Sequence, residues 1–300
     1  MPDETARHAS RGLVPEYALQ EARRNFPGGL FQPEGSFRFS ADALLLAAFA
    51  GAALSADPAV STSQDNPGRP GALLDLGTGC GVVALAFLLR HPEFTAVGVD
   101  VSCELLGAAR RNAANLGLAA RFVAVRADLR DGIVWDQYAG DGMPAVRAGS
   151  FACVTANPPY RVEGTGRLPA SAARRMALFG DAATLPSFVR AGADALAADG
   201  ALCMVFPLDR EESLTAAILN AGLFPRRARS VFFHERSAAK ALPSPGDGLI
   251  LLEAVKKAPA RIVREEPLIM HAGHGADTRL TDEASAFCPW LGKGAERSGC

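Results

Sequence analysis

Short apolar runs alternate with segments of helical periodicity across the middle of the chain. The runs typical of buried strands lie at 72–76, 95–99, 121–125, 151–155 and 200–206. The helical segments between them lie at 82–90, 103–116, 185–197 and 210–221. Such alternation is typical of βαβ units, in which parallel strands are joined by helices that cover the sheet. The pattern therefore predicts an α/β protein built on a mostly parallel sheet.

The pattern changes on both sides of this region. Strand-like runs at 228–234 and 248–255 are separated by the turn-rich stretch 243–248. They predict a hairpin that adds an antiparallel edge and completes a seven-stranded sheet. Near the other end, residues 43–54 are almost wholly apolar, and Ser40 can cap the helix that they form. A helix that is apolar on all sides is expected to be buried.

Stretches rich in Pro, Gly, Ser or charge, without periodicity, set the expected domain limits. The sequence predicts a flexible N-terminal segment at 1–36 and one folded domain at 37–258, which carries a linker insert at 55–71. A C-terminal extension with a flexible tail is expected at 259–300.

Composition adds several exclusions. Of 300 residues, 49% are hydrophobic and 21% are charged, a balance that allows a large core and excludes global disorder. A net charge of −1 argues against a general nucleic-acid coat protein. The longest apolar run, at 43–54, is short of the ~18–20 residues of a membrane span, so a cytoplasmic location is expected. The six cysteines form no CxxC pair, and no metal site is expected.

A glycine-rich loop follows the first predicted strand of the sheet. Asp75 lies within that strand, and Gly77, Gly79 and Gly81 come directly after it, before a helix. Glycines at this place allow the backbone to approach a ligand where side chains would clash. The third glycine comes one residue too early for the dinucleotide fingerprint G-x-G-x-x-G, which disfavours a nicotinamide cofactor.

Two further carboxylates follow the next two strands. Asp100 ends the second strand, 25 positions after Asp75, where a carboxylate can accept from both hydroxyls of a ribose. The simpler alternative is that Asp100 caps the helix beginning near Ser102. Asp128 follows the third strand, where a carboxylate can accept from an adenine amine, with a solvated loop residue as the alternative.

The most specific signal is the tetrapeptide Asn157-Pro158-Pro159-Tyr160 after the fourth strand. The prolines stiffen the backbone and remove two N–H donors, so that carbonyl groups and the Asn157 amide oxygen can accept from an NH₂ group. A planar NH₂ nitrogen is a poor nucleophile because its lone pair is delocalised, and accepting its protons activates it without a strong base. Tyr160 can stack on a planar substrate.

In this order the motifs resemble the class I S-adenosylmethionine-dependent methyltransferases, which have a Rossmann-like fold, over about 37–255. The resemblance implies that 77–81 lines the methionine part of the cofactor, that Asp100 holds the ribose and that Asp128 meets the adenine. The motif at 157–160 is similar to that of N-methyltransferases acting on adenine N6, cytosine N4 or glutamine amides.

Two flanking segments resemble the bacterial tRNA1(Val) (adenine(37)-N6)-methyltransferase family, which modifies the adenine beside the anticodon. They are 37–49 upstream and 267–271 with 280–284 downstream. This resemblance implies a tRNA substrate, with Ser40 and Asp42 closing over the cofactor. Release-factor glutamine methyltransferases share the motif but carry a sizeable helical domain before the glycine-rich loop. This chain has only a short helix and a linker at that place. The release-factor enzymes are therefore the alternative, and the tRNA enzymes are preferred. The inserts at 55–71 and 136–149, Met270 and the tail depart from the tRNA family's pattern.

Basic residues near the motif suit a nucleic-acid substrate. Arg161 and Arg167 lie in a glycine-containing segment directly after Tyr160, where guanidinium groups can clasp phosphates. Arg226, Arg227 and Arg229 would extend a basic rim, although a solvated charged surface is the simpler interpretation. The sequence thus predicts an enzyme that binds tRNA and uses neither a membrane nor a metal.

Overall fold

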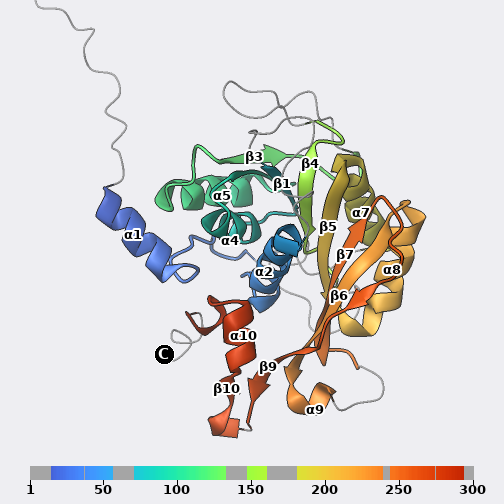
Figure 1. The fold of residues 1–300 in the computed structure, drawn as a ribbon. Coiled ribbons are helices and arrows are strands. Elements are labelled where there is room, and N and C mark those ends of the chain that lie inside the picture. Colours follow the sequence, from blue (N-terminus) through green and yellow to red (C-terminus); the bar gives the residue numbers. More distant parts are fainter. Residues whose placement is uncertain are drawn as a thin grey trace, which may run out of the picture.

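The computed structural model describes residues 15–36, 38–56, 71–132, 147–160, 181–238, 244–273 and 275–293. A ten-stranded mixed sheet forms its centre, in the order β10-β9-β6-β7-β5-β4-β1-β2-β3, with β8 paired to β6 (Figure 1). The strands are β1 (Gly71–Leu76), β2 (Phe94–Asp100), β3 (Phe122–Arg126), β4 (Phe151–Ala156), β5 (Leu196–Pro207), β6 (Phe224–His234), β7 (Gly248–Val255), β8 (Val263–Arg264), β9 (Leu268–Ala272) and β10 (Arg279–Leu280).

The sheet has a parallel half, β1–β5, and a mixed half, β6–β10, which we call the antiparallel half after β7. The pairs β1–β2, β1–β4, β2–β3 and β4–β5 are parallel. Strand β7 lies antiparallel between β5 and β6, and the later strands β8 and β9 pair in parallel with β6. The first half is therefore the doubly wound part, in which ligands bind at the carboxyl ends of the strands.

Helices cover both faces of the sheet. They are α1 (Glu16–Asn25), α2 (Ala41–Ala56), α4 (Val82–Arg90), α5 (Cys103–Asn115), α7 (Thr184–Ala195), α8 (Glu211–Asn220), α9 (Glu235–Ala238) and α10 (Asp282–Phe287), with short 3₁₀ turns η2 (Leu208–Arg210), η3 (Gly275–Asp277) and η4 (Leu291–Lys293). Successive strand residues point to opposite faces, so Leu73 joins the core beneath α2, α4 and α5, and Leu74 joins the core beneath α7 and α8 (Figure 1).

The seven strands predicted from the sequence are all present, and the predicted helices lie where the periodicity put them. The α/β, Rossmann-like prediction is confirmed. The predicted edge is different, because β9 pairs with the outer side of β6 and three short strands extend the sheet. The connection between β6 and β7 also contains α9, so it is longer than a hairpin turn.

The segments expected to flank the domain take part in the fold. Helix α1 forms within the N-terminal segment predicted to be flexible, and Phe26 after it is buried against the ring of Trp290, with 5.2 Å between ring centroids. Strands β8–β10 and helix α10 lie within the predicted C-terminal extension and join the same sheet and core. Their short strands lack a period long enough to be recognised in the sequence.

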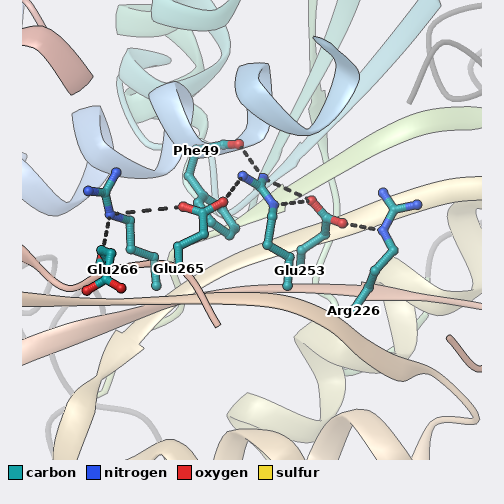
Figure 2. A network of polar contacts seen from close by, with 7 residues as sticks. Phe49, Arg226, Glu253, Glu265 and Glu266 are labelled. Atoms are coloured by element: carbon teal, nitrogen blue, oxygen red, sulfur yellow. Dashed lines mark hydrogen bonds and ion pairs between the residues drawn. The ribbon is translucent and has the colours of Figure 1, made fainter. Parts of the chain in front are cut away.

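An ion-pair network connects α2 to the antiparallel strands (Figure 2). Arg227 donates to the carbonyl oxygen of Phe49 at 2.8 Å and pairs with Glu253 at 2.9 Å and with Glu265 at 2.8 Å. Glu253, 1% exposed, also pairs with Arg226, and Arg229 pairs with Glu283. The three arginines considered for a basic rim therefore form ion pairs with glutamates of the protein itself. The prediction that they form a solvated charged surface is wrong.

Among the described residues, no helix has the length and apolar character that a membrane crossing requires. The same residues include no cluster of three or more His, Cys, Asp or Glu side chains suited to a metal ion.

Candidate active site

The candidate site lies at the edge where β1, β2 and β4 end. Leu76, the last residue of β1, pairs with Val99 of β2 on one side and with Ala156 of β4 on the other. The glycine-rich loop, Asp100 and Asn157 follow these three positions directly. The parallel register therefore brings three segments that are distant in sequence to one edge of the sheet.

Two glycines of the loop have different tasks. Gly79 has φ +57°, and a Cβ built on it would meet nothing within 4 Å, so its backbone faces open space. Gly81 has φ +89°, and a Cβ there would lie 3.2 Å from Ala109 Cβ and from Leu85 Cδ1. Gly81 therefore serves the packing of the loop between α4 and α5, whereas Gly79 leaves room for a ligand.

Asp75 stabilises the glycine-rich loop through hydrogen bonds. It is 1% exposed, and its two carboxylate oxygens accept from the hydroxyl groups of Thr78 at 2.7 Å and Thr155 at 2.8 Å. Burial raises the pKa of Asp75 from 3.8 to about 6, against the opposing effect of these hydrogen bonds. The carboxylate thus links the loop after β1 to strand β4.

Asp100 connects the loop to the start of α5. Its Oδ2 accepts from the backbone N–H of Gly79 at 2.9 Å, and its Oδ1 accepts from the N–H of Ser102 at 2.9 Å. Burial raises the pKa of Asp100, and no cation is among the causes of its shift. The helix cap itself is Ser102, whose hydroxyl accepts from Leu105 N–H at 3.3 Å. The backbone N–H of Val101 also acts on the Asp100 carboxylate. With only backbone N–H groups as its donors and no counter-charge among the described residues, this carboxylate suits a ribose hydroxyl as a further donor.

Asp128 is less prepared for a ligand. Its carboxylate pairs with Arg130 at 2.7 Å, and hydrogen bonds from Arg130 lower its pKa. The side chain is 27% exposed. An adenine amine would have to share this carboxylate with a guanidinium group.

The motif residues meet the start of α2. Asn157 Nδ2 donates to Asp42 Oδ2 at 3.2 Å, and the Tyr160 hydroxyl donates to the same oxygen at 3.5 Å. The other oxygen, Oδ1, accepts from the Ala43 N–H at 3.0 Å and from the Ser40 hydroxyl. The resemblance implied that Ser40 and Asp42 close over the cofactor. The structure brings Asp42 to the motif and binds Ser40 to Asp42.

Arg210 is a second contact of the motif that the sequence did not indicate. Its Nη1 donates to the Tyr160 carbonyl oxygen at 2.6 Å, and its guanidinium lies 5.0 Å from the ring centroid of Phe206. The Phe206 ring meets the Tyr160 ring edge to face, with centroids 6.3 Å apart. Arg210 lies three residues after the end of β5. Its place just beyond a central strand is the feature of the sequence that could have indicated a role at this edge.

Some predicted features lie outside the described residues. They are Arg161 and Arg167, together with most of the inserts at 55–71 and 136–149.

The fold and this edge define a class I methyltransferase. A sequence model of the methyltransferase small domain matches residues 60–220, and the chain belongs to this family. The open backbone at Gly79 and the carboxylate of Asp100 fit the methionine and ribose parts of S-adenosylmethionine, which is the cofactor of this fold and family.

Two curated relatives differ in substrate. The chain is 39% identical over 88 residues to the release factor glutamine methyltransferase of Caulobacter vibrioides, a match covering 29% of this chain and 26% of that protein. It is 27% identical over 179 residues to the tRNA1(Val) (adenine(37)-N6)-methyltransferase of Porphyromonas gingivalis, covering 60% and 62%. The chain thus spans less than two thirds of the length of either relative.

A solved structure supports the fold alone. The crystal structure of a protein described as a predicted O-methyltransferase, Atu636 from Agrobacterium tumefaciens, is 20% identical and aligns with a TM-score of 0.53. The alignment covers 84% of this chain and 96% of that one.

Proposed function

We propose that this chain transfers a methyl group to a planar NH₂ nitrogen, the N6 amine of an adenine in tRNA near the anticodon. The observation that carries this proposal is the meeting of Asn157 and Tyr160 with the buried carboxylate of Asp42, beside the loop that suits the cofactor. The longer of the two curated matches, 179 residues against 88, is with a tRNA adenine methyltransferase, which supports the choice of substrate.

In this proposal the motif supplies acceptors and an aromatic surface. The Asn157 side-chain oxygen and the carbonyl of Pro158 accept the two amine protons, and Tyr160 stacks on the base. S-adenosylmethionine, when bound, supplies the methyl group carried by its sulfonium sulfur. The new N–CH₃ bond forms as the S–CH₃ bond breaks, and the nitrogen then releases one proton to water. No strong base is required, because the acceptors increase electron density on nitrogen.

The remaining site residues are assigned by the same proposal. The cofactor contacts the loop at Gly77 and Gly79, which Asp75 and Gly81 hold in shape. Asp100 and Asp128 accept from its ribose and its adenine, and Ser40 and Asp42 close over it. Arg161 and Arg167 follow the motif and are proposed to contact tRNA phosphates.

Transfer of radiolabelled methyl to bulk tRNA tests the proposal. The tRNA comes from a strain lacking this protein, and the labelled nucleoside is identified after digestion. We expect N6-methyladenosine with the wild-type chain and no label with Asn157→Ala. Cofactor binding without labelled tRNA would reject adenine N6 of tRNA as the substrate.

A second candidate is the side-chain amide of a release-factor glutamine. The 39% identity to a glutamine methyltransferase favours it, and an amide nitrogen needs the same acceptors. Mass spectrometry of a release factor incubated with the chain and cofactor distinguishes the two substrates. An added methyl mass on a glutamine, together with unlabelled tRNA, would replace the first proposal by the second.

A further inference from the structure

Asp42 is a buried carboxylate surrounded by neutral donors. It is 5% exposed, and within the described part of the chain it forms hydrogen bonds but no ion pair. Oxygen Oδ1 serves the start of α2, where it accepts from Ser40 and Ala43. Oxygen Oδ2 serves the motif, where it accepts from Asn157 and Tyr160. The two oxygens thus connect α2 to the loop after β4.

Helix α2 is a firm support for this carboxylate. Residues 43–50 of the helix are all buried, and the helix packs against α4, β5 and β7. Arg227 fixes its middle, because it donates to the Phe49 carbonyl oxygen at 2.8 Å and lies 3.9 Å from the centroid of the Phe49 ring (Figure 2). Arg227 is itself held by Glu253 and Glu265. The position of Asp42 is therefore set by the core and by the ion-pair network.

The charge of Asp42 decides which way the Asn157 amide faces. A carboxylate oxygen can only accept, so it must meet the NH₂ end of the amide, because the carbonyl end would bring two acceptor oxygens together. With Nδ2 held by Asp42, Oδ1 of Asn157 is left to accept from a different group. The preceding strand β4 pairs in parallel with β1, so Asn157 lies at the same edge of the sheet as the glycine-rich loop.

We infer that Asp42 is a positioning residue, which orients the amide of Asn157 so that its oxygen accepts from the amine to be methylated. This inference rests on the proposed function. The hydrogen bond to a charged acceptor also polarises the amide and makes its oxygen a stronger acceptor. Asp42 contacts neither the amine nor the transferred methyl group in this arrangement. It acts through Asn157, and to a smaller extent through Tyr160.

The substitution Asp42→Asn tests this role with little change in size. The single side-chain oxygen of asparagine can serve Ala43 or Asn157 but not both, and its NH₂ group cannot accept from either. We expect kcat for methyl transfer to fall about 10²-fold, as for a misplaced reacting group, with the KM for S-adenosylmethionine within about threefold of wild type. In an Asn157→Ala background the same substitution should cause no further loss.

Asp199→Asn is the matched control. Asp199 is exposed near the start of β5, away from the site, and pairs with Lys257 at 2.8 Å. This variant should keep the kcat and KM of the wild type. Equal melting temperatures of the variants would exclude loss of folded protein as the cause of a lower rate.

A readout that needs no substrate separates this inference from the proposed function. The side-chain NH₂ resonances of Asn157 in ¹⁵N-labelled protein are identified by their disappearance in Asn157→Ala. We expect them to shift in Asp42→Asn and to stay in place in Asp199→Asn. Unshifted resonances, a raised KM for the cofactor with unchanged kcat, or an equal loss in the Asn157→Ala background would each overturn the positioning role. Shifted resonances in a protein that labels neither tRNA nor release factor would reject the proposed function while retaining the contact.

Discussion

Carboxylates in the two halves of the sheet have different kinds of partner. At the ligand-binding edge, Asp75 and Asp100 accept from hydroxyl groups and backbone N–H groups. In the antiparallel half, Glu253 is 1% exposed, like Asp75, and meets the guanidinium groups of Arg226 and Arg227. Burial raises the pKa of both aspartates.

The kind of partner distinguishes carboxylates that serve the ligand-binding edge from carboxylates that stabilise the fold. A carboxylate between two guanidinium groups has its charge neutralised and its lone pairs occupied, so it stabilises the packing of strands and of α2. A carboxylate that meets only neutral donors has no counter-charge and is costly to desolvate. The buried Asp75 uses its oxygens to hold the loop, and the less buried Asp100 can accept from an incoming ligand. The two groups of carboxylates should therefore respond differently to substitution.

The largest effect is expected from breaking the ion-pair network. Glu253→Gln removes the buried charge that Arg226 and Arg227 share, so that Arg227 keeps only Glu265 among the described residues, and we expect the free energy of unfolding to fall by about 3–5 kcal/mol. The affinity for S-adenosylmethionine of the remaining folded protein should stay the same. Denaturant unfolding and calorimetric titration measure the two quantities. Glu283→Gln is the control, because Glu283 is 55% exposed and its pair with Arg229 should contribute less than about 1 kcal/mol. Similar losses for both variants would contradict the proposed contrast.

Asn157→Ala should have the opposite profile. It removes an acceptor that the proposed reaction uses in the transition state, and kcat is expected to fall about 10²–10³-fold, as after loss of a transition-state hydrogen bond. The melting temperature and cofactor affinity should change little. Asn115→Ala, at the exposed end of α5, is the matched control and should keep full activity. Single-turnover kinetics separates the chemical step from binding, and a loss confined to binding would remove Asn157 from the catalytic group.

Asp75 should make the stability depend on pH. Because its pKa is raised from 3.8 to about 6 in the folded protein, the folded state binds this proton more tightly than the unfolded chain does. The free energy of unfolding therefore falls as pH rises through the window between these two values and levels off above it, by up to about 3 kcal/mol for this group. Asp75→Asn should remove this contribution to the pH dependence of the free energy of unfolding, even if the variant is less stable at every pH. Unfolding curves from about pH 4 to pH 7 test this, and parallel slopes in variant and wild type would contradict it.

The smallest expected effects compare two candidate cofactor ligands. Asp100→Asn should weaken S-adenosylmethionine binding by about 1.5–3 kcal/mol, because hydrogen bonds to a charged group are lost. Asp128→Asn should cost less than about 1 kcal/mol, since its exposed carboxylate is shared with Arg130. Calorimetric titration of both variants gives the ranking. The reverse order would mean that Asp128 leaves Arg130 and becomes the stronger ligand when the cofactor binds.

Much of the fold was accessible from local patterns. The seven main strands and the helices α2, α4, α5, α7 and α8 are long enough for their periodicity to show. The short strands β8–β10 and helix α1 were not anticipated, because two to five residues carry no period and α1 buries none of its residues. The sequence therefore predicted the wrong edge for the sheet, because β8, β9 and β10 extend it beyond β6.

The order of the motifs determined the class of protein and its cofactor. A glycine-rich loop, an acidic strand end and the Asn-Pro-Pro-Tyr segment each follow a strand, and parallel strands bring their carboxyl ends to one edge. This much depends on spacing along the chain, which the sequence displays directly. The side chains at these strand ends were named on that basis, whereas Ser40 and Asp42 were named from the resemblance of the upstream segment 37–49 to a tRNA methyltransferase family.

Only the tertiary structure decided which charges are paired. Asp42 and Asn157 are 115 positions apart, and Arg227 and Phe49 are 178 apart, so no local pattern links them. Arg226, Arg227 and Arg229 read like a basic surface in sequence, yet the pairing of β6 with β7, β8 and β9 surrounds them with glutamates. The partner of a charged side chain depends on which distant elements pack together, because Coulomb attraction acts through space and not along the chain.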